Sequence, residues 1–323
     1  MKKPFIITID TEGDSLWDNP KVIETRNARN LPRFQALCDK YGFKPVYLTD
    51  YEMICDNWYV DFASGVAAEG RCEIGLHIHA WNSPPFESTL PYGDSQPFLS
   101  EFPPCEIQGK VRYLKQLIEQ KTGVSVVSHR AGRWGLSPEY AAVLSKEGIK
   151  VDCSATPFVN WSRTKGYQVG GPDFSRVRNS SYYICTEDMM ADDVEPLLEV
   201  PVTIVPASRL TGRVRGEKSP ISSLQGFVGR LLNRKIWLRP GINNLGSMLA
   251  LVEHSRGEDY SYLEFILHSS EFSAGLNPTF ITEKHIDELY QAMDELFANI
   301  SNDYYGCTLA EYEERVRSER SLG

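Results

Sequence analysis

Apolar, β-branched segments alternate with amphipathic segments along this chain, and polar residues come directly after the apolar ones. Residues 4–10 (PFIITID) lead into an acidic run, and residues 262–268 (YLEFILH) end in a histidine followed by serines. About seven strand-then-helix steps of this kind are typical of a parallel sheet with helices packed on its outside. Barrels of this class carry their sites at the carboxyl ends of the strands, where this chain has its polar residues. We therefore expect an α/β fold. It would be a distorted TIM-like (β/α) barrel of about seven parallel strands.

The expected elements follow one another without an internal repeat or a linker, so residues 1–323 are expected to form a single domain. The expected strands cover residues 4–10, 44–50, 72–79, 124–130, 149–154, 197–205 and 262–268. The expected helices cover residues 26–41, 52–69, 106–122, 137–147, 243–255 and 282–299. Residues 155–196, rich in Gly, Pro, Asn, Ser and Asp, are expected to form long loops over the barrel mouth.

Charge and composition exclude several classes of protein. The formal net charge is −9, which opposes broad binding to nucleic acid. No run reaches the roughly 18–20 apolar residues of a membrane span, and the opening MKKPFIITIDTEGD turns acidic within ten positions, so we expect neither an anchor nor a secretory signal. The seven cysteines form no CxxC pair, which indicates reduced thiols. The expected location is cytoplasmic.

A basic insert near residues 207–240 departs from the acidic average. It holds eight basic residues and one acid, Glu217; the basic residues are Arg209, Arg213, Arg215, Lys218, Arg230, Arg234, Lys235 and Arg239. One interpretation is a helix packed on the barrel with a solvated basic side. The other is that the insert contacts a phosphate or pyrophosphate of the substrate, or a membrane surface.

Two motifs have the residue types of a metal site. Asp10, Glu12 and Asp14 alternate along an extended segment, so their carboxylates can lie on one side. A divalent cation would offset their mutual repulsion, although a solvated acidic turn is the alternative. His77 and His79, two residues apart at the end of a strand, place both imidazoles on one face as a transition-metal chelate.

Two further strand ends add candidates for proton transfer. Arg130 and Arg133 follow the strand expected over 124–130, and His268 ends the last expected strand. An arginine beside clustered carboxylates can hold one acid ionised through charge-assisted hydrogen bonds. The alternatives are a surface salt bridge for Arg133 and a structural role for His268. Four polar strand ends together predict one active site.

In this order the motifs resemble those of the polysaccharide deacetylase, or NodB-homology, superfamily of metal-dependent carbohydrate esterases. The resemblance covers most of the chain, through the acidic motif, EIGLHIH, RAGRWG and ILHSSEF. It is strongest to a bacterial subgroup carrying TxDxE, EIGLHxH and LHSSE. It implies that Asp10 is the general base, that Arg130 orients Asp10 and that His268 is the general acid. It also implies that His77 and His79 are metal ligands.

The chain departs from the usual family pattern at two positions. Thr11 stands where the family has a second aspartate, so the acidic ligand would be Glu12 or Asp14. Trp81 stands where the second histidine of the family's motif is usual. The resemblance implies one divalent ion, zinc above all.

The resemblance implies a hydrolase of carbon–nitrogen bonds that removes an acetyl or formyl group from an N-acylated sugar. Given the expected location, a nucleotide- or lipid-linked precursor of cell-surface polysaccharide (O-antigen or lipopolysaccharide) is the expected substrate. The residues expected to contact it are Trp81, Trp134, Arg133 and Glu271.

Three alternatives stay open. One is an amidohydrolase-type barrel enzyme, for which His129, His254 and His285 are further histidines. Another is a metal-free amide hydrolase of the same barrel. The third is a carbohydrate-binding protein without turnover, in which Trp81, Trp134 and Trp161 would stack on sugars.

Overall fold

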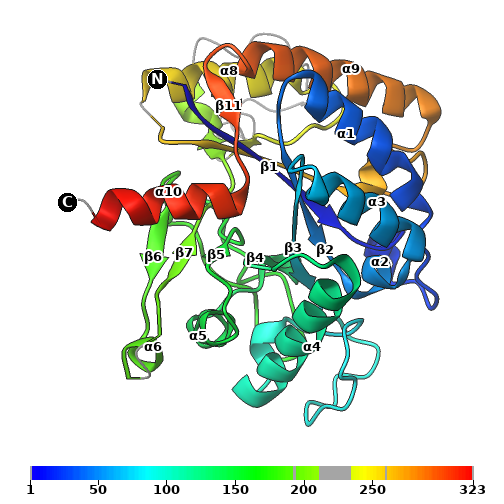
Figure 1. Ribbon diagram of the computed structural model, residues 1–323, viewed down its shortest axis with the longest axis vertical. Coiled ribbons are helices and arrows are strands. Elements are labelled where there is room, and N and C mark those ends of the chain that lie inside the picture. The colour runs from blue at the N-terminus through cyan, green and yellow to red at the C-terminus, as the bar shows by residue number, and fades with distance from the viewer. Residues whose placement is uncertain (1, 192–193, 211–233, 259, 322–323) are drawn as a thin grey trace, which may run out of the picture.

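The computed structural model describes residues 2–191, 194–210, 234–258 and 260–321 (Figure 1). Most of the basic insert, residues 211–233, lies outside the described residues. The strands are β1 (Lys3–Thr11), β2 (Pro45–Thr49), β3 (Glu73–Ile78), β4 (Ser128–Ala131), β5 (Val151–Asp152), β6 (Tyr182–Ile184), β7 (Leu197–Glu199), β8 (Ile204–Pro206), β9 (Lys235–Trp237), β10 (Leu263–His268) and β11 (Tyr304–Gly306). The helices are α1 (Leu31–Lys40), α2 (Tyr51–Cys55), α3 (Asn57–Ala68), α4 (Pro104–Thr122), α5 (Pro138–Lys146), α6 (Glu187–Ala191), α8 (Leu245–Gly257), α9 (Glu283–Ile300) and α10 (Leu309–Ser321).

The main sheet confirms the expected α/β fold. Its strands run in the order β10-β1-β2-β3-β4-β5-β7-β6, and β11 pairs with β1. Pairing is parallel from β10 through β7, which are the seven parallel strands that the sequence predicts. Figure 1 shows α9, α1, α3, α4 and α5 following one another around the outside of the curled sheet. The result is a distorted, incomplete TIM-like barrel.

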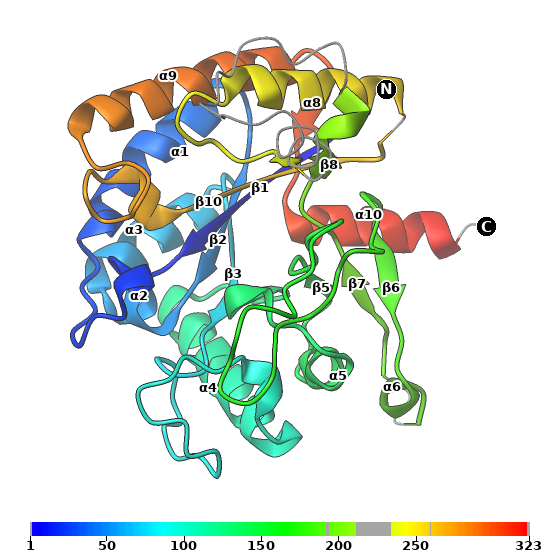
Figure 2. The ribbon, with the colours of Figure 1, turned by 180° about the vertical axis from the view of Figure 1, so that it is seen from behind.

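A two-stranded ribbon, β8 and β9, lies on the open side of the barrel, next to β10 (Figure 2). The backbone N–H of Thr203 donates to the carbonyl of Glu264 at 3.3 Å, and that of Ile266 donates to Leu238 at 3.3 Å. These two backbone hydrogen bonds stand where a regular barrel would have a continuous ladder between β10 and a neighbouring strand.

Both faces of the sheet are buried, because residues that alternate along a strand point to opposite sides. In β1, Phe5, Ile7 and Ile9 pack in the larger core cluster, which includes residues of the outer helices. Ile6 points the other way, into a second cluster inside the barrel that includes Leu309 of α10. Thus α10 closes one end of the barrel, and the polar strand ends occupy the other.

Two expectations about the elements are wrong, and two C-terminal elements were not predicted. Residues 155–196 are not loops throughout, because β6 pairs antiparallel with β7 and α6 follows it. The single strand expected over 197–205 is divided into β7 and β8, which belong to different sheets. The C-terminal β11 and α10 were not expected. In each case the decisive contacts come from distant segments, which local periodicity does not report.

None of the helices within the described ranges combines the length and the apolar character that crossing a membrane requires.

We expect Leu309→Ala to lower the free energy of unfolding by about 2–5 kcal/mol, because it leaves a cavity in the closed end of the barrel. Leu309 is fully buried. Glu314→Ala, an exposed position on the same helix, is the control and should change stability by less than about 0.5 kcal/mol. Urea denaturation measures both, and equal effects would argue against α10 as the closing element.

Candidate active site

The four polar strand ends meet at one end of the barrel. The register pairs Asp10 with His268 across β1 and β10, and His77 with Arg130 across β3 and β4. Paired residues of neighbouring strands point to the same face of a sheet. Asp10, His77 and His268 accordingly line one cavity of about 400 Å³, together with Glu12 and His79.

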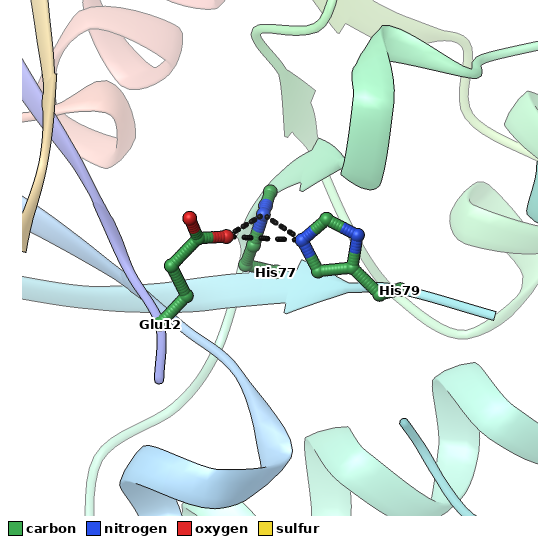
Figure 3. A group of neighbouring side chains, drawn as sticks. All are labelled: Glu12, His77 and His79. Atoms are coloured by element: carbon green, nitrogen blue, oxygen red, sulfur yellow. Dashed lines mark hydrogen bonds and ion pairs between the residues drawn. The ribbon is translucent and has the colours of Figure 1, made fainter. Parts of the chain in front are cut away.

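Glu12, His77 and His79 form a buried group whose ligand atoms converge (Figure 3). The two Nε2 atoms of the histidines are 3.1 Å apart. Oε2 of Glu12 lies 3.0 Å from Nε2 of His79 and 3.4 Å from Nε2 of His77. Ligands at bond lengths of about 2.0–2.2 Å on a tetrahedral ion are about 3.3–3.6 Å apart, so these atoms are close to one face of such a tetrahedron. The donor set fits a divalent transition metal.

Protonation favours the same interpretation. Nδ1 of His77 lies 3.0 Å from the carbonyl oxygen of Arg130. Because a carbonyl only accepts, His77 carries a proton on Nδ1, and Nε2 is the nitrogen directed at Glu12 and His79. Burial alone would lower the pKa of His77, but Asp10 and Glu12 raise it, so a bound metal would replace a proton on Nε2. Burial alone would raise the pKa of Glu12, but His268, His77 and His79 outweigh it and lower that pKa, so the carboxylate is ionised.

Gly132 lets the loop after β4 pass directly against this group. A Cβ at this position would lie 2.5 Å from Nδ1 of His79 and 2.6 Å from the carbonyl oxygen of Ile78. Any side chain would therefore displace His79 or the end of β3.

Of the two acids that the motif left open, only Glu12 lies beside the histidines. The chain bends after Glu12, where the N–H of Asp14 donates to the carbonyl of Glu24 at 2.7 Å. The Asp14 carboxylate then accepts hydrogen bonds from Arg26 and Asn27 at 2.7–3.1 Å. The alternation predicted along this segment ends before Asp14.

Arg130 holds Asp10 from inside the barrel. Its Nη1 donates to Oδ1 of Asp10 at 2.6 Å, and its Nη2 donates to Oε1 of Glu264 at 2.5 Å. Burial alone would raise the pKa of Asp10, but Arg130, His77 and His268 outweigh burial and lower it. Asp10 is therefore the ionised member of the two acids that share Arg130.

Glu264 is a buried acid that the sequence analysis did not single out, although it interrupts the apolar strand YLEFILH. Burial raises its pKa to about 8 despite Arg130. Among the described residues its Oε2 has no hydrogen-bond partner. One guanidinium neutralises one carboxylate, so Glu264 is the acid that keeps its proton near neutral pH.

His268 faces Asp10 across the cavity, with its Nε2 3.5 Å from Oδ2 of Asp10. Its Nδ1 lies 3.1 Å from Oε2 of Glu271. Arg239, which the sequence analysis assigned only to the basic insert, places Nη2 3.0 Å from Glu271 and 3.2 Å from Nδ1 of His268. Burial would raise the pKa of Glu271, but Arg239 and His268 lower it to about 2. Glu271 thus lies behind His268 and does not line the active-site cavity.

Three indole rings, those of Trp81, Trp134 and Trp161, line the cavity above these groups. Arg133 also lines it, but its guanidinium donates to the backbone carbonyls of Gln96 and Lys165, at 2.7 Å for the latter, and so joins two loops. The cavity wall therefore combines three indole rings with charged and polar side chains.

The additional histidines of the amidohydrolase alternative do not join the Glu12 group. His129 bonds Asp152 at 2.6 Å and Tyr140 of α5 at 2.8 Å. His254 lies on α8 and His285 on α9. Within the described ranges, Glu12, His77 and His79 are the one group with metal-ligand geometry.

We expect Glu12→Gln to lose bound metal, because it removes the anionic ligand. Its affinity for Zn²⁺ should fall by more than the roughly 10–100-fold that is typical of removing an outer-shell partner. Asp14→Asn removes a matched charge two residues away and should keep its metal. Metal content per chain after dialysis, measured by atomic emission, tests both; similar loss from the two variants would contradict the assignment.

We expect Glu264→Gln to stabilise the protein increasingly as the pH rises from about 5 to 8. A pKa of about 8 in the folded state, above the unfolded value, means that the folded state binds more protons in this window. As the pH rises, ionisation of Glu264 therefore lowers the free energy of unfolding of the wild type by up to about 1.4 kcal/mol per pH unit. Glutamine does not ionise, so the variant does not lose this stability. Urea denaturation at pH 5, 6.5 and 8 measures it, and parallel curves for the two proteins would refute the raised pKa.

Comparison with known proteins supports the resemblance at the level of the fold. No known protein-family model matches this sequence, and no curated protein matches it. A protein from Mycobacterium smegmatis assigned as a polysaccharide deacetylase is 14% identical, with a TM-score of 0.57 over 99% of this chain and 92% of that one. The 4-alpha-glucanotransferase of Thermococcus litoralis is also 14% identical, with a TM-score of 0.52 over 97% of this chain and 40% of that one. Since two activities occur on this fold, function is argued from the site. The chain thus shares its fold with a protein assigned as a polysaccharide deacetylase.

Proposed function

We propose that this protein is a metal-dependent hydrolase that removes an N-acyl group, acetyl or formyl, from a sugar. One observation carries the proposal. Nε2 of His268 lies 3.5 Å from Oδ2 of Asp10, directly beside the convergent ligand atoms of Glu12, His77 and His79, in a cavity that three tryptophans also line. An acid and a base on either side of a metal site are the groups that amide hydrolysis needs.

Glu12, His77 and His79 would hold the ion, for which we propose zinc because of the two imidazoles and one carboxylate. When bound, such an ion supplies Lewis-acid chemistry for an acyl carbonyl and for water. Asp10, ionised and oriented by Arg130, accepts the proton of the attacking water. Because Arg130 is fully buried and bonded on both sides, Asp10 is held in place before substrate arrives.

His268 performs the second proton transfer. An amine leaves an amide only when its nitrogen is protonated. His268 lines the cavity, and its Nε2 lies 3.5 Å from Oδ2 of Asp10. Glu271 accepts from the backbone N–H of His268 at 2.9 Å and lies beside its Nδ1. The carboxylate therefore orients the ring with the proton of Nδ1 directed away from the substrate.

The indole rings support a sugar as the substrate. Trp81, Trp134 and Trp161 offer flat apolar faces of the kind on which the C–H face of a sugar packs. The likeness to a protein assigned as a polysaccharide deacetylase supports the same class. The nucleotide- or lipid-linked precursor and the cytoplasmic location stay predictions.

We expect Asp10→Asn and His268→Ala to lower kcat by about 10²–10⁴-fold each while metal content stays unchanged, because each removes one proton-transfer group. His285→Ala, a histidine outside the cavity, is the control and should keep full activity. The assay is release of acetate or formate, and of a primary amine, from N-acylated amino sugars. Full activity in either test variant would remove the mechanism, and sugar binding without release from the wild type would favour a binding protein.

A further inference from the structure

The connection after β5 contains a narrow hairpin, residues 160–173, that contributes to the wall of the active-site cavity. Antiparallel bridges join residues 160 and 173 at its base and residues 165 and 170 near its tip. Trp161 and Thr164, on one leg of this hairpin, line the cavity. The indole N–H of Trp161 donates to Oγ1 of Thr156 at 2.8 Å, which orients the ring. The position of the hairpin therefore decides where one of the three indole rings lies.

A single carboxylate, that of Glu101 in the connection between β3 and α4, holds the tip of this hairpin. Its Oε1 accepts from the backbone N–H groups of Gln168 and Val169 at 2.6 and 3.0 Å. Its Oε2 accepts from the N–H of Tyr167 at 2.9 Å and from that of Phe98 at 2.7 Å. Burial would raise the pKa of Glu101, but these four hydrogen bonds outweigh burial and lower it. The carboxylate is therefore ionised, and its hydrogen bonds to the tip are charge-assisted.

Packing around the buried ring of Phe98 supports the same arrangement. A Cβ at Gly166 would lie 2.7 Å from this ring, and one at Gly171 would lie 3.0 Å from it. A Cβ at Gly135, in the turn after β4, would also lie 2.7 Å from the ring. The guanidinium of Arg133 lies 4.5 Å from the ring centre on the side of the same turn. Segments that follow β3, β4 and β5 thus contact one aromatic side chain, and a larger residue at these glycines would separate them.

We propose that Glu101 is a positioning residue for substrate binding, which holds the hairpin so that Trp161 stands in the cavity wall before a sugar arrives. The proposal rests on the proposed function, because it names the residue that fixes one of the surfaces on which the sugar would pack. Glu101 lies outside the lining of the cavity and acts through the hairpin. A surface that is ordered in advance loses less conformational entropy when a ligand binds. Loss of Glu101 should therefore weaken binding and leave proton transfer at Asp10 and His268 unchanged.

The first test follows Trp161 directly and needs no ligand. The tryptophans are replaced by fluorotryptophan, and the fluorine NMR signal of Trp161 is assigned with Trp161→Phe. In Glu101→Gln an amide nitrogen replaces one oxygen and faces two N–H donors whichever way the amide turns. We therefore expect the Trp161 signal to shift or broaden. Glu87→Gln, an exposed position in the same connection, removes the same charge and should leave the signal unchanged. An unchanged Trp161 signal in Glu101→Gln would overturn the proposal.

The second test measures the consequence for binding, with N-acetyl amino sugars as substrates. Glu101→Gln should raise KM by about tenfold or more and change kcat by less than about twofold, because it removes pre-organisation of the wall and no proton-transfer group. Gly166→Ala keeps the charge but places a methyl group against Oε2 of Glu101, and it should have the same effect. This second variant keeps the test valid if Glu101→Gln does not fold. Glu87→Gln should change neither constant. An unchanged KM, or an equal fall in kcat, would contradict a role in positioning the wall.

A double-mutant cycle connects Glu101 to Trp161 and separates this proposal from the proposed function. Trp161→Ala should raise KM, and adding Glu101→Gln should raise it no further, because the ring that Glu101 positions is gone. A further rise of the same size in the double variant would contradict an action through Trp161. If no N-acyl sugar is hydrolysed but the fluorine signal of Trp161 responds to Glu101→Gln, the function fails and the positioning of Trp161 stands. If hydrolysis occurs but neither that signal nor KM responds, the positioning fails and the function stands.

Discussion

The buried guanidinium of Arg130 is the interaction on which the rest of the site depends. It donates to Asp10 of β1, to Glu264 of β10 and, through Nε, to the carbonyl of Cys153 after β5. A buried cation is stable only when it is paired, and here the pairing joins strands on both sides of β4. Since one cation neutralises one acid, the two acids differ in protonation: Asp10 is ionised and Glu264 is protonated.

The same residue positions the candidate metal ligands. The carbonyl of Arg130 holds Nδ1 of His77, so the side chain of Arg130 orients the proposed base while its backbone orients a ligand. Gly132, two residues later, leaves room for His79. A displacement of β4 would therefore disturb the proposed base and the candidate ligands together.

The other side of the site is built around Arg239. This arginine contacts Glu271 and His268, and it lines the active-site cavity. A substrate group that binds there would lie next to the proposed general acid. Arg239, which follows β9, thus connects the proposed general acid to the wall of the active-site cavity.

Much of the site could be predicted from the sequence, because the carboxyl ends of parallel strands meet at one edge whatever the loops between them do. Strand periodicity was therefore enough to bring Asp10, His77 and His268 to one cavity, with Arg130 directly behind Asp10. Tertiary structure alone decided that Glu12 and not Asp14 faces the histidines, that Glu271 lies behind His268, and that Glu264 and Arg239 complete the network. The physical reason is that each of these outcomes depends on a partner from a distant segment: Glu24 and Asn27 bend the chain at Asp14, and Arg130 selects between two acids that are 254 residues apart in the chain.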